Sequence, residues 1–107
     1  MMMTLTRVSL AVLLTVVAAS AWVHAGSVRL VNNYYNTICK VEVIKGINAP
    51  QTGSPESYSN VAKGVVTSAE GRLCFRRSAD PANCASPLTE WRCADKGTSG
   101  TLEFNLY

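Results

Sequence analysis

Hydrophobic and polar residues alternate along several short stretches of this chain, and turn-forming residues separate those stretches. In residues 37–45 (TICKVEVIK), Cys39, Val41 and Val43 fall on one face of an extended strand, and charged residues fall on the other. Residues 101–107 alternate in the same way. A period of two is typical of strands with one buried face, so both segments are predicted to be β-strands. Two isoleucines within 37–45 interrupt the alternation, which predicts partial cover on both faces of that strand.

Further strands are predicted wherever strand-forming residues lie between turn signals, namely at residues 28–31, 62–67, 72–78 and 88–94. Helical spacing with Tyr58 is an alternative for residues 62–67, but Gly64 and a β-branched run favour a strand there. The polar segments 46–60 and 79–87, which contain Gly or Pro, are predicted to be surface loops. About six short strands predict an all-β fold: a small, disulfide-bonded antiparallel β-sandwich or barrel.

Residues 1–25 have the three parts of a cleavable signal peptide, which would form a helix ahead of the β domain. Arg7 ends a short positively charged region, and residues 8–23 are almost wholly apolar and uncharged. The small-residue pattern that ends at Ala25 suits signal peptidase, so Gly26 is predicted to be the first mature residue.

Cleavage after Ala21 is the alternative site, and an uncleaved membrane anchor is the alternative role. The apolar run of 16 residues is shorter than the roughly 20 that a membrane-spanning helix needs, which favours the signal peptide. The mature chain is then a single small β domain, residues 26–107, with no membrane span, located in the periplasm or secreted.

All four cysteines lie in the predicted mature chain, and no two of them form a Cys-x-x-Cys pair, which argues against a zinc site or a thioredoxin-type redox site. A domain of only 82 residues buries too little surface to be stable on its hydrophobic core alone, and an oxidising compartment allows disulfides to form. Two structural disulfides are therefore predicted. The residues concerned are Cys39, Cys74, Cys84 and Cys93.

One register of a hairpin between residues 72–78 and 89–94 places Cys74 opposite Cys93. In that register Arg76 falls opposite Trp91, where a guanidinium can stack on the indole. The other two cysteines, Cys39 and Cys84, would then pair with each other. The main rival pairing is Cys39–Cys74 with Cys84–Cys93, and the sequence leaves both open.

The order VRLVNN–x–YNTICKVEV, then GRLCFRR, then WRC and a terminal strand resembles small secreted bacterial proteins of unknown function. The resemblance covers most of the mature chain. It implies a β-sandwich and a Cys74–Cys93 bond, and it brings no activity with it. Cys39 and Cys84 depart from the pattern, so the resemblance implies nothing about a second bond.

The residues available for chemistry argue against an enzyme. The one histidine, His24, lies in the predicted signal peptide, which excludes the usual Ser-His and Cys-His nucleophiles and histidine metal sites. Seven carboxylates remain, but 82 residues rarely form both a framework and a deep cleft for a carboxylate pair. No metal or other cofactor is predicted. Without Arg7 the chain has nine basic and seven acidic residues, and a net charge of +2 is too small to indicate nucleic-acid binding.

Aromatic and basic residues outside the predicted core are the candidate binding residues: Tyr34, Tyr35, Tyr58, Arg76 and Trp91. Aromatic rings in loops stack on sugars or anchor protein interfaces, although packing over a small core is the simpler alternative. The arginines at 72, 76, 77 and 92 predict either contact with an anionic partner or an ordinary solvated strand surface.

These features favour a non-catalytic binding domain in the periplasm or outside the cell. Its partner would be a protein or glycan of the cell envelope or exterior, contacted through residues 46–60 and the Tyr34–Tyr35 turn. The alternatives are a small disulfide-stabilised inhibitor of a secreted hydrolase, such as a lysozyme or protease, and a structural envelope protein.

Overall fold

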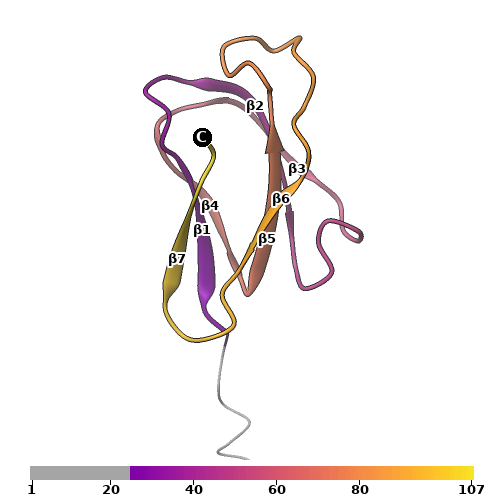
Figure 1. Ribbon diagram of the computed structural model, residues 1–107, viewed down its shortest axis with the longest axis vertical. Coiled ribbons are helices and arrows are strands. Elements are labelled where there is room, and N and C mark those ends of the chain that lie inside the picture. The colour runs from indigo at the N-terminus through magenta and orange to yellow at the C-terminus, as the bar shows by residue number, and fades with distance from the viewer. Residues whose placement is uncertain (1–24) are drawn as a thin grey trace, which may run out of the picture.

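The computed structural model describes residues 25–107, and the predicted signal peptide lies outside the described residues except for Ala25. Seven strands and no helix occur in this segment (Figure 1). The strands are β1 (Ser27–Asn32), β2 (Ile38–Lys45), β3 (Glu56–Val61), β4 (Gly64–Glu70), β5 (Arg72–Arg77), β6 (Arg92–Asp95) and β7 (Thr101–Asn105). Within residues 25–107 there is no helix long and apolar enough to cross a membrane. The predicted all-β class is confirmed.

The strands form two sheets, one with the order β4-β1-β7 and one with the order β3-β2-β5-β6. Neighbouring strands are antiparallel except β1 and β7, which run parallel, so the prediction of a wholly antiparallel fold is wrong at this pair. Because no strand joins the two sheets through a hydrogen-bonded ladder in the described segment, the arrangement is that of a sandwich rather than a closed barrel.

A common core lies between the two sheets. Phe75 of β5 meets Phe104 of β7 edge to face, with ring centroids 5.0 Å apart, so the contact joins one sheet to the other. Every second residue of β1 is buried, as alternation requires. The buried members of this core are Val28, Leu30, Ile38, Val41, Val43, Val61, Leu73, Phe75 and Leu106.

A second, smaller cluster accounts for the isoleucine that interrupts the alternation near the end of β2. Ile44, Ala49 and Cys74 are buried together, and Trp91 and Cys93 pack against them. Ala49 comes from the β2–β3 connection, so this connection covers part of the four-stranded sheet. The predicted partial cover on both faces of β2 is therefore confirmed.

The prediction of a loop throughout residues 46–60 is wrong at its end, because β3 begins at Glu56. The sequence ESYSNV is polar and lacks the hydrophobic alternation of a strand with a buried face. β3 is an edge strand with mostly exposed residues, and its order comes from the ladder with β2, in which Val61 pairs with Ile38 and Glu56 with Val43.

Other strand boundaries differ from the predicted ones. The strand predicted at 62–67 is β4 and runs to Glu70, and the strand predicted at 88–94 is regular only from Arg92. Before it, a single bridge joins Leu88 to Ser78. The terminal strand stops at Asn105.

Both disulfides have the connectivity of the favoured register. Cys74 pairs with Cys93 across β5 and β6, and Cys39 is bonded to Cys84. The rival pairing is wrong. The predicted stacking is also confirmed, since the Arg76 guanidinium carbon lies 4.5 Å from the Trp91 ring centroid.

Gly26 lies where three segments meet ahead of β1. Its N–H donates to the Lys96 carbonyl oxygen at 3.0 Å, and its own carbonyl accepts from the Gly71 N–H at 2.8 Å. A Cβ at this position would overlap the main-chain oxygen atoms of Thr98 and Gly100. Only glycine therefore fits between the β6–β7 turn and the β4–β5 corner.

Candidate functional site

Three tyrosines lie together at one end of the sandwich. Because β1 and β7 are parallel neighbours, the turn after β1 and the residues after β7 meet at the same end, near the top of Figure 1. The Tyr34 ring centroid lies 4.5 Å from that of Tyr35 and 4.5 Å from that of Tyr107, with tilted planes. Tyr35 is 80% exposed and Tyr107 is 59% exposed, whereas Tyr34 packs partly against the core. We call Tyr34, Tyr35 and Tyr107 the tyrosine cluster.

Asparagine side chains hold the main chain of this cluster. The Asn33 amide nitrogen donates to the Tyr107 carbonyl oxygen at 2.9 Å, and the Tyr107 N–H donates to the Asn33 side-chain oxygen at 2.8 Å. Buried Asn32 accepts from the Tyr34 N–H at 3.0 Å and donates to the Val61 carbonyl oxygen at 2.9 Å. Side-chain hydrogen bonds from two asparagines thus hold the main chain at Tyr34 and Tyr107.

Arg77 contacts the tyrosine cluster through Tyr107 and the adjoining main chain, although the sequence suggested a surface residue. The side chain is buried, and its Nε donates to the Leu106 carbonyl oxygen at 2.6 Å while Nη1 donates to the Ser78 carbonyl oxygen at 2.9 Å. The guanidinium carbon lies 5.0 Å from the Tyr107 ring centroid. Burial lowers the pKa of Arg77, and the charge of Arg92 lowers it further. Arg77 therefore connects β5 to the chain after β7.

Tyr34 has the most perturbed hydroxyl of the cluster. Hydrogen bonding with the Tyr35 side chain, followed by burial, raises the pKa of Tyr34 to about 12. The negative charge of Asp80 acts in the same direction, so Asp80 lies close enough to influence this hydroxyl. Tyr34 therefore stays neutral near neutral pH.

A shallow hollow of about 240 Å³ adjoins the same turn. Asn36 and Thr37 directly follow the two tyrosines in sequence and form part of its wall. Its lining is entirely uncharged and includes Asn36, Thr37, Asn60, Pro81 and the Cys39–Cys84 disulfide. The Cys39 N–H also donates to the Pro81 carbonyl oxygen at 2.7 Å, so a hydrogen bond and a covalent bond both fix this wall.

The other candidate binding residues lie elsewhere. Arg76 stacks on Trp91 and forms an ion pair with Glu42 at 2.6 Å, which links β2, β5 and the segment before β6. Tyr58 lies on edge strand β3, packs partly against the core and donates to the Glu56 carboxylate at 3.2 Å. The structure therefore brings together two of the predicted pairs, Tyr34 with Tyr35 and Arg76 with Trp91.

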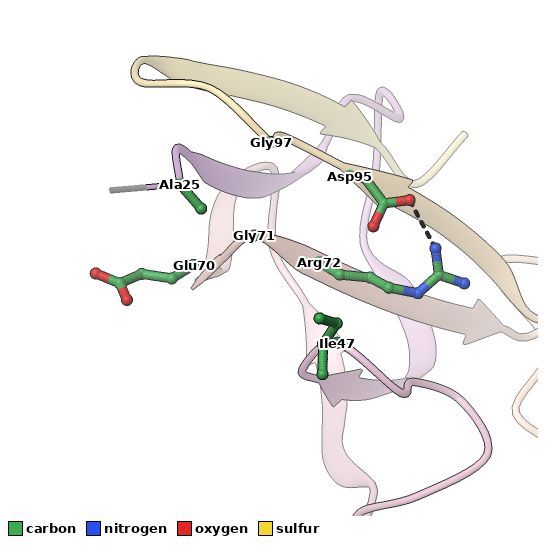
Figure 2. Close-up of a pocket in the computed structure, with 7 residues that line it drawn as sticks. All are labelled: Ala25, Ile47, Glu70, Gly71, Arg72, Asp95 and Gly97. Carbon is green, nitrogen blue, oxygen red and sulfur yellow. Dashed lines mark hydrogen bonds and ion pairs between the residues drawn. The ribbon is translucent and has the colours of Figure 1, made fainter. Parts of the chain in front are cut away.

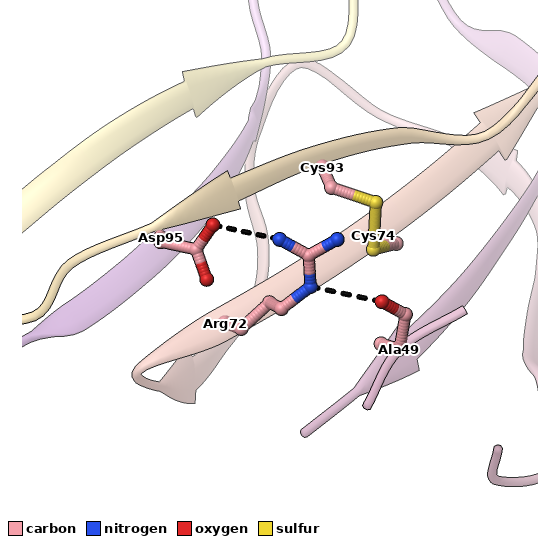
Figure 3. Close-up of polar contacts among 5 residues, drawn as sticks. All are labelled: Ala49, Arg72, Cys74, Cys93 and Asp95. Carbon is pink, nitrogen blue, oxygen red and sulfur yellow. Dashed lines mark hydrogen bonds and ion pairs between the residues drawn. A yellow bond between two sulfur atoms is a disulfide. The ribbon is translucent and has the colours of Figure 1, made fainter. Parts of the chain in front are cut away.

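The four arginines do not form a continuous basic surface. Arg72 donates to the Asp95 carboxylate at 2.7 Å and, through Nε, to the Ala49 carbonyl oxygen at 2.8 Å (Figure 3). Arg76 is paired with a carboxylate and Arg77 is buried, which leaves Arg92 as the exposed member. The anionic-partner interpretation thus has little uncompensated charge to support it.

A second hollow, of about 400 Å³, lies at the opposite end, beside the Gly71 corner (Figure 2). Arg72 and Asp95 are joined along one side of it, and the Glu70 carboxylate points away from Arg72. Ile47, 88% exposed, stands at its rim. Ile47 belongs to the β2–β3 connection that the sequence singled out as a contact segment, residues 46–60.

Within residues 25–107 no group of three or more His, Cys, Asp or Glu side chains is arranged to hold a metal ion. Comparison with protein-family models, with curated proteins and with solved structures found no match to this chain. The resemblance to small secreted bacterial proteins therefore stays a prediction.

Sequence reasoning missed Tyr107 and Arg77 as members of the site. Tyr107 looked like the end of a strand, and Arg77 looked like a surface charge. The parallel pairing of β1 with β7 brings Tyr107 beside Asn33, 74 positions earlier in the sequence, and Arg77 reaches the site through its hydrogen bond to the Leu106 carbonyl oxygen.

Proposed function

We propose that this chain is a non-catalytic binding domain of an oxidising extracytoplasmic compartment, and that it contacts its partner through the tyrosine cluster. The observation that carries the proposal is the exposure of two rings, Tyr35 and Tyr107, beside Tyr34, with the main chain of Tyr34 and Tyr107 held by hydrogen bonds. Exposed tyrosines supply large contact areas with few rotatable bonds, and a fixed backbone loses little entropy on binding.

The compartment follows from the two disulfides and from the predicted signal peptide. Disulfides persist in the periplasm and outside the cell, where thiols are not kept reduced. Every cysteine of the chain is disulfide-bonded, which fits such a compartment. Export through cleavage after Ala25 remains part of the proposal.

The experiment uses residues 25–107, because both sheets, the core and both disulfides lie within this segment. The immobilised domain is exposed to envelope extract and culture supernatant, in parallel with a Tyr35→Ala/Tyr107→Ala double variant. We expect the wild-type domain to retain a partner that the double variant loses. Equal retention by both would overturn the role of the tyrosine cluster, and turnover of a substrate by the domain would overturn the non-catalytic assignment.

An inhibitor of a secreted hydrolase is the second candidate, because the β2–β3 connection presents Ile47 from a held loop. The Ala49 N–H donates to the Gly46 carbonyl oxygen at 3.1 Å, and Arg72 holds the Ala49 carbonyl. A single stoichiometric hydrolase that is retained by the wild type and lost with Ile47→Ala would favour the inhibitor. Retention that survives Ile47→Ala favours the tyrosine cluster.

A further inference from the structure

We propose that the tyrosine cluster and the adjoining uncharged hollow together form a binding site for a neutral oligosaccharide. One sugar ring would enter the hollow, and its neighbours would lie across the exposed tyrosine rings. This inference rests on the proposed function, since it names the ligand class for the same end of the sandwich. It is carried by the exposed rings, the free hydrogen-bonding groups of the hollow and the distribution of charge around both.

The rings supply the stacking surface. Tyr35 and Tyr107 each contact Tyr34, with planes tilted by 46° and 50° relative to it. An aromatic face carries partial negative charge, and the C–H groups of a sugar ring carry partial positive charge, so the two attract when they stack. Because the exposed rings Tyr35 and Tyr107 are two separate surfaces that both adjoin Tyr34, a chain of sugar units can contact both.

The hollow supplies hydrogen bonds. Among the described residues, no partner takes the Asn36 amide nitrogen, the Thr37 hydroxyl or the Asn60 side-chain amide. Asn36, Thr37 and Asn60 all line one small space and carry donors and acceptors, and hydroxyl groups of a sugar both donate and accept. The hollow of about 240 Å³ is smaller than the roughly 300–1,000 Å³ of sites that enclose a drug-sized molecule, so it suits one unit of a longer chain.

Two features constrain the main chain around the hollow. Asn60 has φ of +51°, a left-handed conformation that asparagine tolerates better than most residues. On the opposite wall, the Cys39–Cys84 disulfide fixes residue 84 and the neighbouring Pro81. A site whose walls are fixed in advance loses little conformational entropy when it binds.

The charges favour a neutral ligand over an acidic one. The lining of the hollow is uncharged, Asp80 directly precedes Pro81 of that lining, and the exposed Arg92 lies outside it. The nearby guanidinium of Arg77 is buried and bonded to main-chain oxygen atoms. A carboxylate or phosphate on the ligand would therefore meet Asp80 without a free cation in the lining.

The test is titration calorimetry of residues 25–107 with cello-, manno-, galacto- and chito-oligosaccharides, and with oligogalacturonate as the acidic match to the galacto series. We expect binding of at least one neutral series and none of oligogalacturonate. Tyr35→Ala and Tyr107→Ala should each weaken binding by about two- to tenfold, because each removes one stacked ring. Both polar contacts of Tyr107 are main-chain, so its substitution leaves them in place.

Two variants test the hollow separately from the rings. Thr37→Val keeps the side-chain shape and removes the hydroxyl, and Asn60→Gly removes the amide while allowing the positive φ. Each should weaken binding by about two- to tenfold, the usual worth of one hydrogen bond. Ile47→Ala, an equally exposed apolar residue at the other end, is the matched control and should leave the affinity unchanged.

Tighter binding of oligogalacturonate than of the neutral series would overturn the inference. Failure of every oligosaccharide, with capture of a protein that needs Tyr35 and Tyr107, would overturn the neutral-glycan ligand and leave the proposed function standing. Failure of every oligosaccharide, with capture that ignores both tyrosines, would overturn both.

Discussion

At the residue scale, Tyr34 is the group whose ionisation the fold changes most clearly. Its pKa lies at about 12, against about 10 for a free tyrosine, so between these values the unfolded chain loses a proton that the folded chain keeps. The contribution of Tyr34 to stability is therefore fully present below pH 10 and is lost as the pH rises through 12. The unfolding free energy of the wild type should fall more steeply across this window than that of Tyr34→Phe.

Denaturant unfolding at several alkaline pH values, together with the tyrosinate absorbance of the folded protein, measures this effect. One of the four tyrosines should titrate near pH 12 in the wild type, and that phase should be missing from Tyr34→Phe. Tyr35→Phe should move the phase to lower pH, because hydrogen bonding with Tyr35 is its largest cause. Identical titrations for the wild type and Tyr34→Phe would contradict the assignment.

Residue positions were predictable from the sequence where local pattern determines them. The exposure of one ring of the Tyr34–Tyr35 turn follows from adjacent aromatic residues in a turn, and the structure exposes Tyr35. Alternation along β5 places Arg77 on the face of buried Leu73 and Phe75, but its positive charge had suggested a solvated side chain. Its partners are the carbonyl of Leu106 and the ring of Tyr107, about 30 positions away, so only tertiary structure reveals its role.

At the scale of elements, Gly26 determines how closely β1 can approach the β6–β7 turn. Gly26→Ala places a methyl group against main-chain oxygen atoms, and backbone atoms cannot move aside as a flexible side chain can. We expect this substitution to lower the unfolding free energy by about 1–3 kcal/mol, the usual cost of overpacking. Chemical denaturation followed by the fluorescence of Trp91, the one tryptophan in residues 25–107, measures the change.

Gly97→Ala is the matched control for Gly26→Ala. Gly97 lies in the same β6–β7 turn, and a Cβ there meets nothing within 4 Å. The unfolding free energy should change by no more than about 0.5 kcal/mol. Equal effects of the two substitutions would show that the loss reflects backbone entropy in the turn rather than the close contact at Gly26.

The sequence predicted a strand well where the strand's own residues determine its pairing, and poorly where a neighbouring strand does. The hairpin of β5 and β6 has its register marked by Cys74 and Cys93, and the structure reproduces it. The residues of β3 contain no comparable signal. They are polar, and they form a strand because they pair with β2. The hollow beside the tyrosine cluster was out of reach for the same reason, since Asn60 and Pro81 meet only in the assembled sandwich.

At the scale of the whole molecule, the two disulfides differ in their access to solvent. In the Cys39–Cys84 bond Cys84 is exposed and Cys39 is buried, whereas in the Cys74–Cys93 bond Cys74 is fully buried and Cys93 is half-buried against the small cluster with Ala49. A reducing thiolate must reach a sulfur atom, so the Cys39–Cys84 bond should open first under mild reduction. Opening it releases a loop with a sequence separation of 45, which should lower the unfolding free energy by about 4 kcal/mol.

Timed reduction, alkylation and peptide mapping check this order. Label should accumulate on Cys39 and Cys84 while Cys74 and Cys93 stay unlabelled until the domain unfolds. A Cys39→Ala/Cys84→Ala variant should reproduce the loss of stability in the absence of reductant. Early labelling of Cys74 would contradict the protection that the small cluster provides.

The parallel pairing of β1 with β7 has a consequence for the timing of folding. Ser27 pairs with Thr101, so the first strand of the sandwich completes its ladder only with the last. Contacts this far apart in sequence make folding slow relative to local pairing, because a long loop must close first. While synthesis proceeds from the N-terminus, β1 waits without its second neighbour until residues 101–105 exist. The β4-β1-β7 sheet is therefore complete only when nearly the whole chain has been synthesised, whereas β2, β3 and β5 can pair earlier.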